Sequence, residues 1–227
     1  EPTPQQVEEH RNAFMWIRLG ELFDKKVERV FREMDSPITI VDVTDGIELL
    51  SSCEGPVISA GHASCDHPEA KDLHIWLSPR LAKIQAKTIA DALSLQFPDL
   101  KEEFERNLAT LLDELDFIDK EITQLLLPLK GSAIMASHPA FTYFCKDYGL
   151  IQIPVEIEGK EPLPQQVTQI MEQAKAYSIK SILIEPQYSN KGAELIAQRM
   201  RIPTHIINPY DEDYANNMLT LAKLIAE

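Results

Sequence analysis

The chain has 227 residues, 44% of them hydrophobic, and a formal net charge of −14 at pH 7. This length suffices for one large or two small domains with hydrophobic cores of their own. The acidic surplus argues against a nucleic-acid or anionic-membrane surface, because such surfaces need clustered lysine and arginine. No apolar stretch reaches the roughly 18 residues that a membrane span requires.

The N-terminal third alternates helix and strand signals. A proline followed by acidic residues predicts a short helix over 4–12, and 13–19 predicts a buried strand. An amphipathic pattern predicts a helix over 25–33, and β-branched residues predict a second strand over 38–43. The stretch 53–72 is rich in glycine and proline and predicts a long loop, which is typical of functional or disordered segments.

The three cysteines form no CxxC pair, so neither a structural zinc module nor a dense disulfide framework is indicated. Cys53 and Cys65 flank a loop and could pair in an oxidising compartment, a point that the sequence leaves open. Cys145 falls in a predicted helix, where we expect it to pack as a small apolar side chain.

The longest periodic stretch of the chain runs from Pro98 to Pro128. Hydrophobic residues recur there every three or four positions: Phe104, Leu108, Leu111, Leu112, Leu115, Ile118, Ile122 and Leu125. The pattern predicts a helix about 40 Å long at 1.5 Å per residue, preceded by a helical segment from Ser78 to Phe97. A coiled coil is the alternative, but the spacing drifts from a strict heptad and favours a helix packed along a two-lobed body.

Beyond Pro128, short buried strands alternate with helices. The predicted strands are 133–136, 151–155, 181–184 and 204–207, and the predicted helices are 140–148, 164–177, 192–200 and 211–226. This order predicts parallel pairing through right-handed crossovers, in an open α/β sheet with helices on both faces.

Polar side chains follow three of these strands. His138 lies two residues beyond the first strand, Glu185 one beyond the third and Asn208 one beyond the fourth, so all three are expected at the ligand-binding edge. Neutral imidazole is the commonest metal ligand in proteins. His138 and His74, if brought together from separate lobes, would supply half of a tetrahedral metal site.

Six motifs cover nearly the whole chain: Glu1-Pro2-Thr3-Pro4, Val41-Asp42-Val43-Thr44-Asp45-Gly46-Ile47, Asp72-Leu73-His74-Ile75-Trp76-Leu77-Ser78-Pro79, Ser137-His138-Pro139-Ala140-Phe141, Gly159-Lys160-Glu161-Pro162 and Ile184-Glu185-Pro186-Gln187-Tyr188. In order and spacing they resemble the ZnuA/TroA-like family, the metal-specific solute-binding proteins of bacterial ABC importers.

The resemblance implies two α/β lobes with parallel sheets, joined by a long rigid spine helix, with the metal site in the cleft between the lobes. Residues 1–97 would form the N-terminal lobe, lacking its first strand. Residues 98–128 would form the spine helix, and residues 129–227 the C-terminal lobe.

The resemblance also implies a ligand set. His74 and His138 match two of the family's histidines, and a further histidine is expected a few residues upstream of Glu1. Asn208 stands where the family has an aspartate, and its neutral carbonyl oxygen is a poorer partner for a divalent cation. The candidates to supply the missing charge or position are Asp211, Asp213, Glu185 and water. Imidazole ligands favour zinc, whereas added carboxylates favour manganese, the alternative metal.

Other residues near these motifs carry more modest expectations. Trp76 and Phe141 are expected to pack beside the histidines, and Glu185 to orient a ligand imidazole through its other ring nitrogen. His10 and His205 match no ligand position. The loop from His62 to His67 falls where zinc-specific members carry a histidine-rich loop, and either metal capture or simple solvation fits it.

These expectations converge on a carrier. We expect extracytoplasmic or periplasmic binding of a divalent metal, zinc first, by a monomer that docks on the membrane permease of an ABC importer and binds no nucleic acid. No catalytic motif of the common hydrolase, kinase or dinucleotide-binding types is found, so we expect no enzyme. The alternatives are a hydrolase that uses an open metal position and a metal-dependent adhesin.

Overall fold

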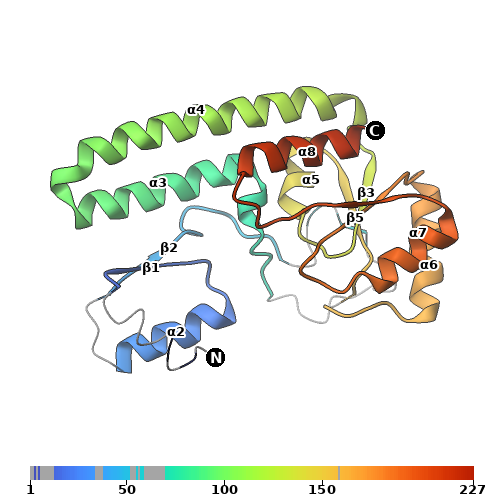
Figure 1. Ribbon diagram of the computed structural model, residues 1–227, viewed down its shortest axis with the longest axis horizontal. Helices are drawn as coiled ribbons and strands as arrows, with labels where there is room; N and C mark the ends of the chain where they lie inside the picture. The colour runs from blue at the N-terminus through green and yellow to red at the C-terminus, as the bar shows by residue number, and fades with distance from the viewer. Residues whose placement is uncertain are drawn as a thin grey trace. The chain divides into compact units, whose positions relative to one another are not determined.

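The computed structural model describes residues 3, 5, 13–33, 38–51, 55, 57–58, 70–157 and 159–227. The chain divides into two compact units, Glu1–Leu49 with Leu81–Asp113 and Leu50–Arg80 with Glu114–Glu227. Each unit contains its own parallel sheet, which confirms the predicted α/β class (Figure 1). The helix predicted over 4–12 and the loop predicted over 53–72, with Cys53, Cys65, His62 and His67, fall largely or wholly outside the described residues.

The N-terminal segment of the first unit contains a pair of strands and one amphipathic helix. Strand β1 (Met15–Arg18) pairs in parallel with β2 (Thr39–Asp42). Helix α2 (Leu22–Glu33) buries Val27 and Phe31, four residues apart on one face. Its start is fixed by Asp24, whose Oδ2 accepts hydrogen bonds of 2.9–3.1 Å from three backbone N–H groups, those of residues 19–21. These groups have no partner inside the helix, so the carboxylate satisfies them.

Two long helices follow each other along the chain. Helix α3 (Pro79–Gln96) ends before Pro98, the 3-10 turn Pro98–Leu100 reverses the direction, and α4 (Lys101–Leu126) follows (Figure 1). The helix predicted from the periodicity between Pro98 and Pro128 is thus confirmed. Leu115, Ile118, Ile122 and Leu126 are its buried residues, and their spacing of three or four places them on one face. None of the described helices is both long enough and apolar enough to cross a membrane.

The second unit holds a four-stranded parallel sheet in the order β4-β3-β5-β6. Its elements are β3 (Ala133–Ala136), α5 (Thr142–Tyr148), β4 (Ile151–Pro154), α6 (Pro164–Ala176), β5 (Ile182–Ile184), α7 (Lys191–Met200), β6 (Thr204–Ile206) and α8 (Tyr214–Ala226). Figure 1 shows α6 and α7 on one side of the sheet and α5 and α8 on the other. The predicted parallel sheet, covered on both faces, is confirmed.

The core of this sheet explains why it forms here. Met135, Ile153 and Ile182, one from each of three adjacent strands, pack with Ile170 of α6 and Ile196 of α7, and each is at most 1% exposed. Strand residues that are buried on both faces form continuous apolar runs, which is the pattern of β3 and β5. Cys145 is buried in α5 as a free thiol, as predicted.

The second unit includes residues 50–80, which precede the long helices in the sequence. Tyr143 of α5 ties this segment down, because its hydroxyl donates to the carbonyl oxygen of Asp72 (2.8 Å) and accepts from the backbone N–H of Leu50 (3.0 Å). His74 therefore lies in the same compact unit as His138. The predicted division into residues 1–97, 98–128 and 129–227 stays a prediction about the lobes of the protein.

Candidate metal centre

The structure brings His74 and His138 together. His138 follows the end of β3 by two residues, and His74 directly precedes the 3-10 turn Ile75–Leu77. Their ring centroids lie 5.2 Å apart with an interplanar angle of 71°. Because a zinc–nitrogen bond is roughly 2 Å long, two rings at this separation are close enough to share one ion.

Each imidazole is hydrogen bonded to a carboxylate through its Nδ1 atom. His74 Nδ1 lies 2.8 Å from Asp72 Oδ1, and His138 Nδ1 lies 2.5 Å from Glu156 Oε2. An ionised carboxylate only accepts, so Nδ1 carries the proton and Nε2 keeps its lone pair free. This carboxylate–histidine arrangement is how proteins fix the tautomer and the ring orientation of a metal-ligating histidine.

Asp72 holds its histidine through a local turn. Its Oδ1 accepts from the backbone N–H of His74 (2.9 Å) as well as from Nδ1. Burial, aided by the charge of Asp72, raises the pKa of Tyr143 to about 12, so the hydroxyl stays protonated and donates to the Asp72 carbonyl. The acid and its histidine are thus anchored together.

Glu156 reaches His138 through the pairing of β3 with β4. The parallel ladder continues past both strands, because Val155 N donates to Ala136 O (2.8 Å) and Glu156 N donates to Ser137 O (2.9 Å). Glu156 therefore lies beside His138, although the two are 18 residues apart in the chain.

Glu185 is fully buried next to these groups. Neither of its carboxylate oxygens has a hydrogen-bond partner among the described residues. Burial raises the pKa of Glu185 to about 7, and the negative charge of Glu156 adds to the rise, whereas the interaction with nearby His138 opposes it. Glu185 is not the Nδ1 partner of His74 or His138, because each of these imidazoles is bonded to a different acid. That Glu185 orients another ligand imidazole stays a prediction.

Glu185 should make the stability of the metal-free protein depend on pH. Its folded-state pKa, about 7, lies above the ordinary value of 4.5, so its stabilising contribution is present below pH 4.5 and is lost as pH rises through 7. Glu185→Gln stays neutral, so its free energy of unfolding relative to wild type should rise by roughly 2 kcal/mol between pH 5 and pH 8. Urea unfolding at both pH values measures this difference. The exposed-site variant Glu194→Gln is the control, and equal pH profiles for wild type and Glu185→Gln would contradict the prediction.

Asn208 follows β6 by two residues and begins a tight turn. Its Oδ1 accepts from the backbone N–H of Tyr210 (3.1 Å) and from Gln187 Nε2 (2.5 Å). An amide oxygen has two lone pairs, and both are engaged here. In this conformation Asn208 therefore has no free oxygen lone pair for a metal.

Two of the alternatives to Asn208, Asp211 and Asp213, also bond to the backbone. Asp211 Oδ1 accepts from the N–H of Asp213, and Asp213 Oδ1 caps α8 by accepting from Asn216 N (3.2 Å). In the part of the chain that the structure describes, no three His, Cys, Asp or Glu side chains are grouped to hold one ion. The described site is therefore a pair of imidazoles.

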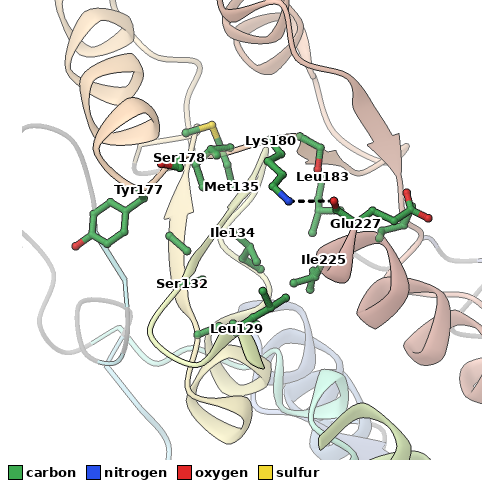
Figure 2. A pocket seen from close by; sticks show the side chains of 15 residues that line it. Leu129, Ser132, Ile134, Met135, Tyr177, Ser178, Lys180, Leu183, Ile225 and Glu227 are labelled. Carbon is green, nitrogen blue, oxygen red and sulfur yellow. Dashed lines mark hydrogen bonds between the residues drawn. The ribbon is translucent and has the colours of Figure 1, made fainter. Parts of the chain in front are cut away.

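A separate cavity of about 210 Å³ lies at the opposite, amino-terminal edge of the sheet (Figure 2). It is lined largely by apolar side chains, among them Ile134, Leu183 and Ile225, and Lys180 Nζ donates to the Glu227 carbonyl oxygen beside it (3.1 Å). Its lining includes no histidine or cysteine, so this cavity offers no imidazole or thiolate ligand.

Sequence reasoning missed the two acids that hold the imidazoles. Asp72 left a local signal, because an aspartate two residues before a histidine can bond both its N–H and its ring. Glu156 left none that a single sequence reveals, since its position depends on strand register.

Two imidazoles, each oriented by a carboxylate at one edge of an α/β fold, are the arrangement that metal-binding proteins use. Residues 1–227 match the model of the family described as ZnuA, the periplasmic zinc-uptake complex component A, and the chain belongs to this family. It is a solute-binding protein, not an enzyme.

Several relatives are similar along most of the chain. The high-affinity zinc uptake system protein ZnuA of Bacillus subtilis is 28% identical over 211 residues, which span 92% of this chain and 66% of that protein. A crystal structure of ZnuA superposes with a TM-score of 0.88 at 32% identity, covering all of this chain and 83% of that one. A zinc-bound ZnuA deletion mutant gives a TM-score of 0.87 at 32% identity, with 100% and 82% covered.

Proposed function

We propose that this protein binds a divalent transition metal ion, zinc in the first place, and delivers it to an ABC-type importer. The observation that carries the proposal is the pair of adjacent imidazoles, each with Nδ1 bonded to an acid and Nε2 free. His74 and His138 are the proposed ligands. The zinc named in the family description and the zinc bound in one similar structure support the choice of metal.

Zinc fits the donor set better than manganese does. Imidazole nitrogens suit zinc, whereas manganese prefers carboxylate, carbonyl and water oxygens. Asp72 and Glu156 are occupied at the Nδ1 atoms, so they act through the histidines. Manganese remains the second candidate, favoured if further carboxylates complete the site.

The remaining coordination positions are proposed for groups outside the described pair. The candidates are water, Glu185, and any of Asn208, Asp211 and Asp213 after it gives up one of its present hydrogen bonds. The proposed setting is extracytoplasmic, with the protein acting as a monomer that docks on its membrane permease.

Competitive titration of the full chain against a chromophoric zinc chelator tests the proposal. We expect one tightly bound zinc per chain, weaker binding of manganese, and a higher melting temperature in excess zinc, because a ligand that binds only the folded state stabilises it. In proteoliposomes that hold the cognate importer, the loaded protein should stimulate ATP hydrolysis more than the metal-free protein. A chain that takes up no zinc would overturn the proposal.

A further inference from the structure

We propose that Tyr188 and Tyr210 form an aromatic cover over the two imidazoles, and that Tyr188 positions the His138 ring and slows zinc release. The inference rests on the proposed function, because it assigns a role at the same site. Neither tyrosine is proposed as a ligand.

The central contact is a stack of two rings. The Tyr188 ring lies on the His138 ring with a centroid distance of 4.3 Å and an interplanar angle of 13°. The lone pair that binds a metal lies in the plane of the imidazole, so a ring stacked on its face leaves Nε2 free. Glu156 fixes the Nδ1 edge of the same ring, and the two contacts together restrict both its tilt and its rotation.

A chain of aromatic contacts extends from Tyr188 to the second histidine. The hydroxyl groups of Tyr188 and Tyr210 lie 3.3 Å apart, and the Tyr210 ring lies 5.7 Å from that of Trp76. Trp76 in turn lies 5.4 Å from His74. Tyr188 precedes α7 and Tyr210 precedes α8, so the contact between them joins the two loops that lead into these helices.

The loop that carries Tyr188 is held in shape by its own hydrogen bonds. Tyr188 N donates to Glu185 O (3.2 Å), and Asn190 Nδ2 donates to the carbonyl oxygens of Glu185 (2.9 Å) and Tyr188 (3.2 Å). The tyrosine backbone is therefore fixed before a metal arrives, and little order remains to be gained on binding.

Glu161 anchors the same loop from outside. Its Oε1 accepts from Ser189 Oγ (2.5 Å), and its Oε2 accepts from the N–H of Gly192 (2.8 Å) in the first turn of α7. A carboxylate is favoured at the start of a helix. A Cβ atom at position 192 would meet Glu161 Oε2 at 2.6 Å and Pro162 Cδ at 2.7 Å, so the close approach requires glycine. In the Gly159-Lys160-Glu161-Pro162 motif, Glu161 therefore fixes the loop that carries Tyr188 to the start of α7.

The stack should favour the loaded state. A metal-bound imidazole is more positive than a free one, and the face of a phenol ring attracts positive charge. The stack raises zinc affinity only if it is stronger in the metal-bound state than in the metal-free state. Aromatic pairs of this kind contribute roughly threefold to tenfold in an equilibrium constant beyond the area that they bury.

Stopped-flow measurement of zinc release into excess chelator tests the cover. Tyr188→Ala should speed release by about tenfold and leave the association rate unchanged. Tyr188→Phe, which keeps the ring, should stay within about twofold of wild type. Tyr177→Ala, at the opposite edge of the sheet, is the matched control and should release zinc at the wild-type rate. If Tyr188→Ala does not fold, Tyr188→Leu replaces it, since leucine fills space without an aromatic face.

A nuclear magnetic resonance readout tests the geometry directly. The ring protons of His138 should show an upfield ring-current shift in wild type and in Tyr188→Phe, and the shift should disappear in Tyr188→Ala. Release from Tyr188→Ala at the wild-type rate, or equally fast release from Tyr188→Phe and Tyr188→Ala, would overturn the cover while zinc binding by wild type upholds the proposed function. A wild-type chain that binds no zinc would overturn the proposed function itself.

Discussion

Replacing either His138 or His74 with alanine should weaken zinc binding by at least about a hundredfold. A complete four-ligand zinc site contributes about 10–16 kcal/mol at pH 7, so each ligand accounts for roughly 3 kcal/mol, which corresponds to more than a hundredfold in the dissociation constant. The carboxylate bonded to each imidazole also fixes the orientation of the ring. Replacing the histidine therefore removes an oriented nitrogen ligand, and a water molecule is a poor substitute for it.

Competitive titration of both variants measures the effect, and His205→Ala provides the matched control. His205 lies in β6 and is expected to leave zinc affinity unchanged. Wild-type affinity in both the His74 and the His138 variants would refute the ligand assignment. A large loss in only one of them would leave a single histidine in the site.

Replacing the carboxylate that is bonded to each imidazole should cause the second-largest loss of zinc affinity. Loss of such a hydrogen-bond partner typically lowers metal affinity by about 10- to 100-fold. Glu156→Ala and Asp72→Ala are expected in this range, because the freed ring can rotate and its Nε2 becomes less basic. Glu156→Gln and Asp72→Asn keep an accepting oxygen but lose the charge, so a smaller loss, about tenfold or less, is expected.

The same titrations measure these variants, with the exposed-site variant Glu194→Ala as control. A graded order from wild type through the amide to the alanine variant would support the hydrogen bond as the cause. Amide and alanine variants that both bind zinc like wild type would contradict the role of these acids.

Helices and strands of this chain were predictable where the periodicity was long. Helix α4 was predicted from the stretch between Pro98 and Pro128, because one face of this helix stays apolar for many turns. Helix starts were less accurate, since they depend on contacts that single-residue patterns do not show. Helix α5 begins at Thr142 rather than Ala140, where the buried Gln152 side chain accepts from Phe141 N (2.8 Å). Helix α8 begins at Tyr214, because Asp213 caps it.

The site was predictable only in part. The rule that ligands gather at the carboxyl ends of parallel strands placed His138 and Glu185 near each other, and the structure has the Glu185 carboxyl buried close to His138. The rule did not assign the Nδ1 partner, because Glu156 depends on how β3 registers against β4. The rule also could not show that the amide oxygen of Asn208 is occupied. Its hydrogen bonds from Gln187 and Tyr210 depend on the folded structure and leave no pattern in the sequence.

The two imidazoles differ in how their acidic partners are encoded, and this has an evolutionary consequence. Asp72 lies two positions before His74, so both residues of this pair belong to one tripeptide. Insertions elsewhere in the chain leave that tripeptide intact. Glu156 lies two residues beyond the neighbouring strand β4, and a slip of one residue in the pairing of β3 with β4 would turn its side chain to the other face of the sheet. Descendants of this chain should therefore tolerate insertions and deletions around the first pair far better than in the segment between β3 and β4.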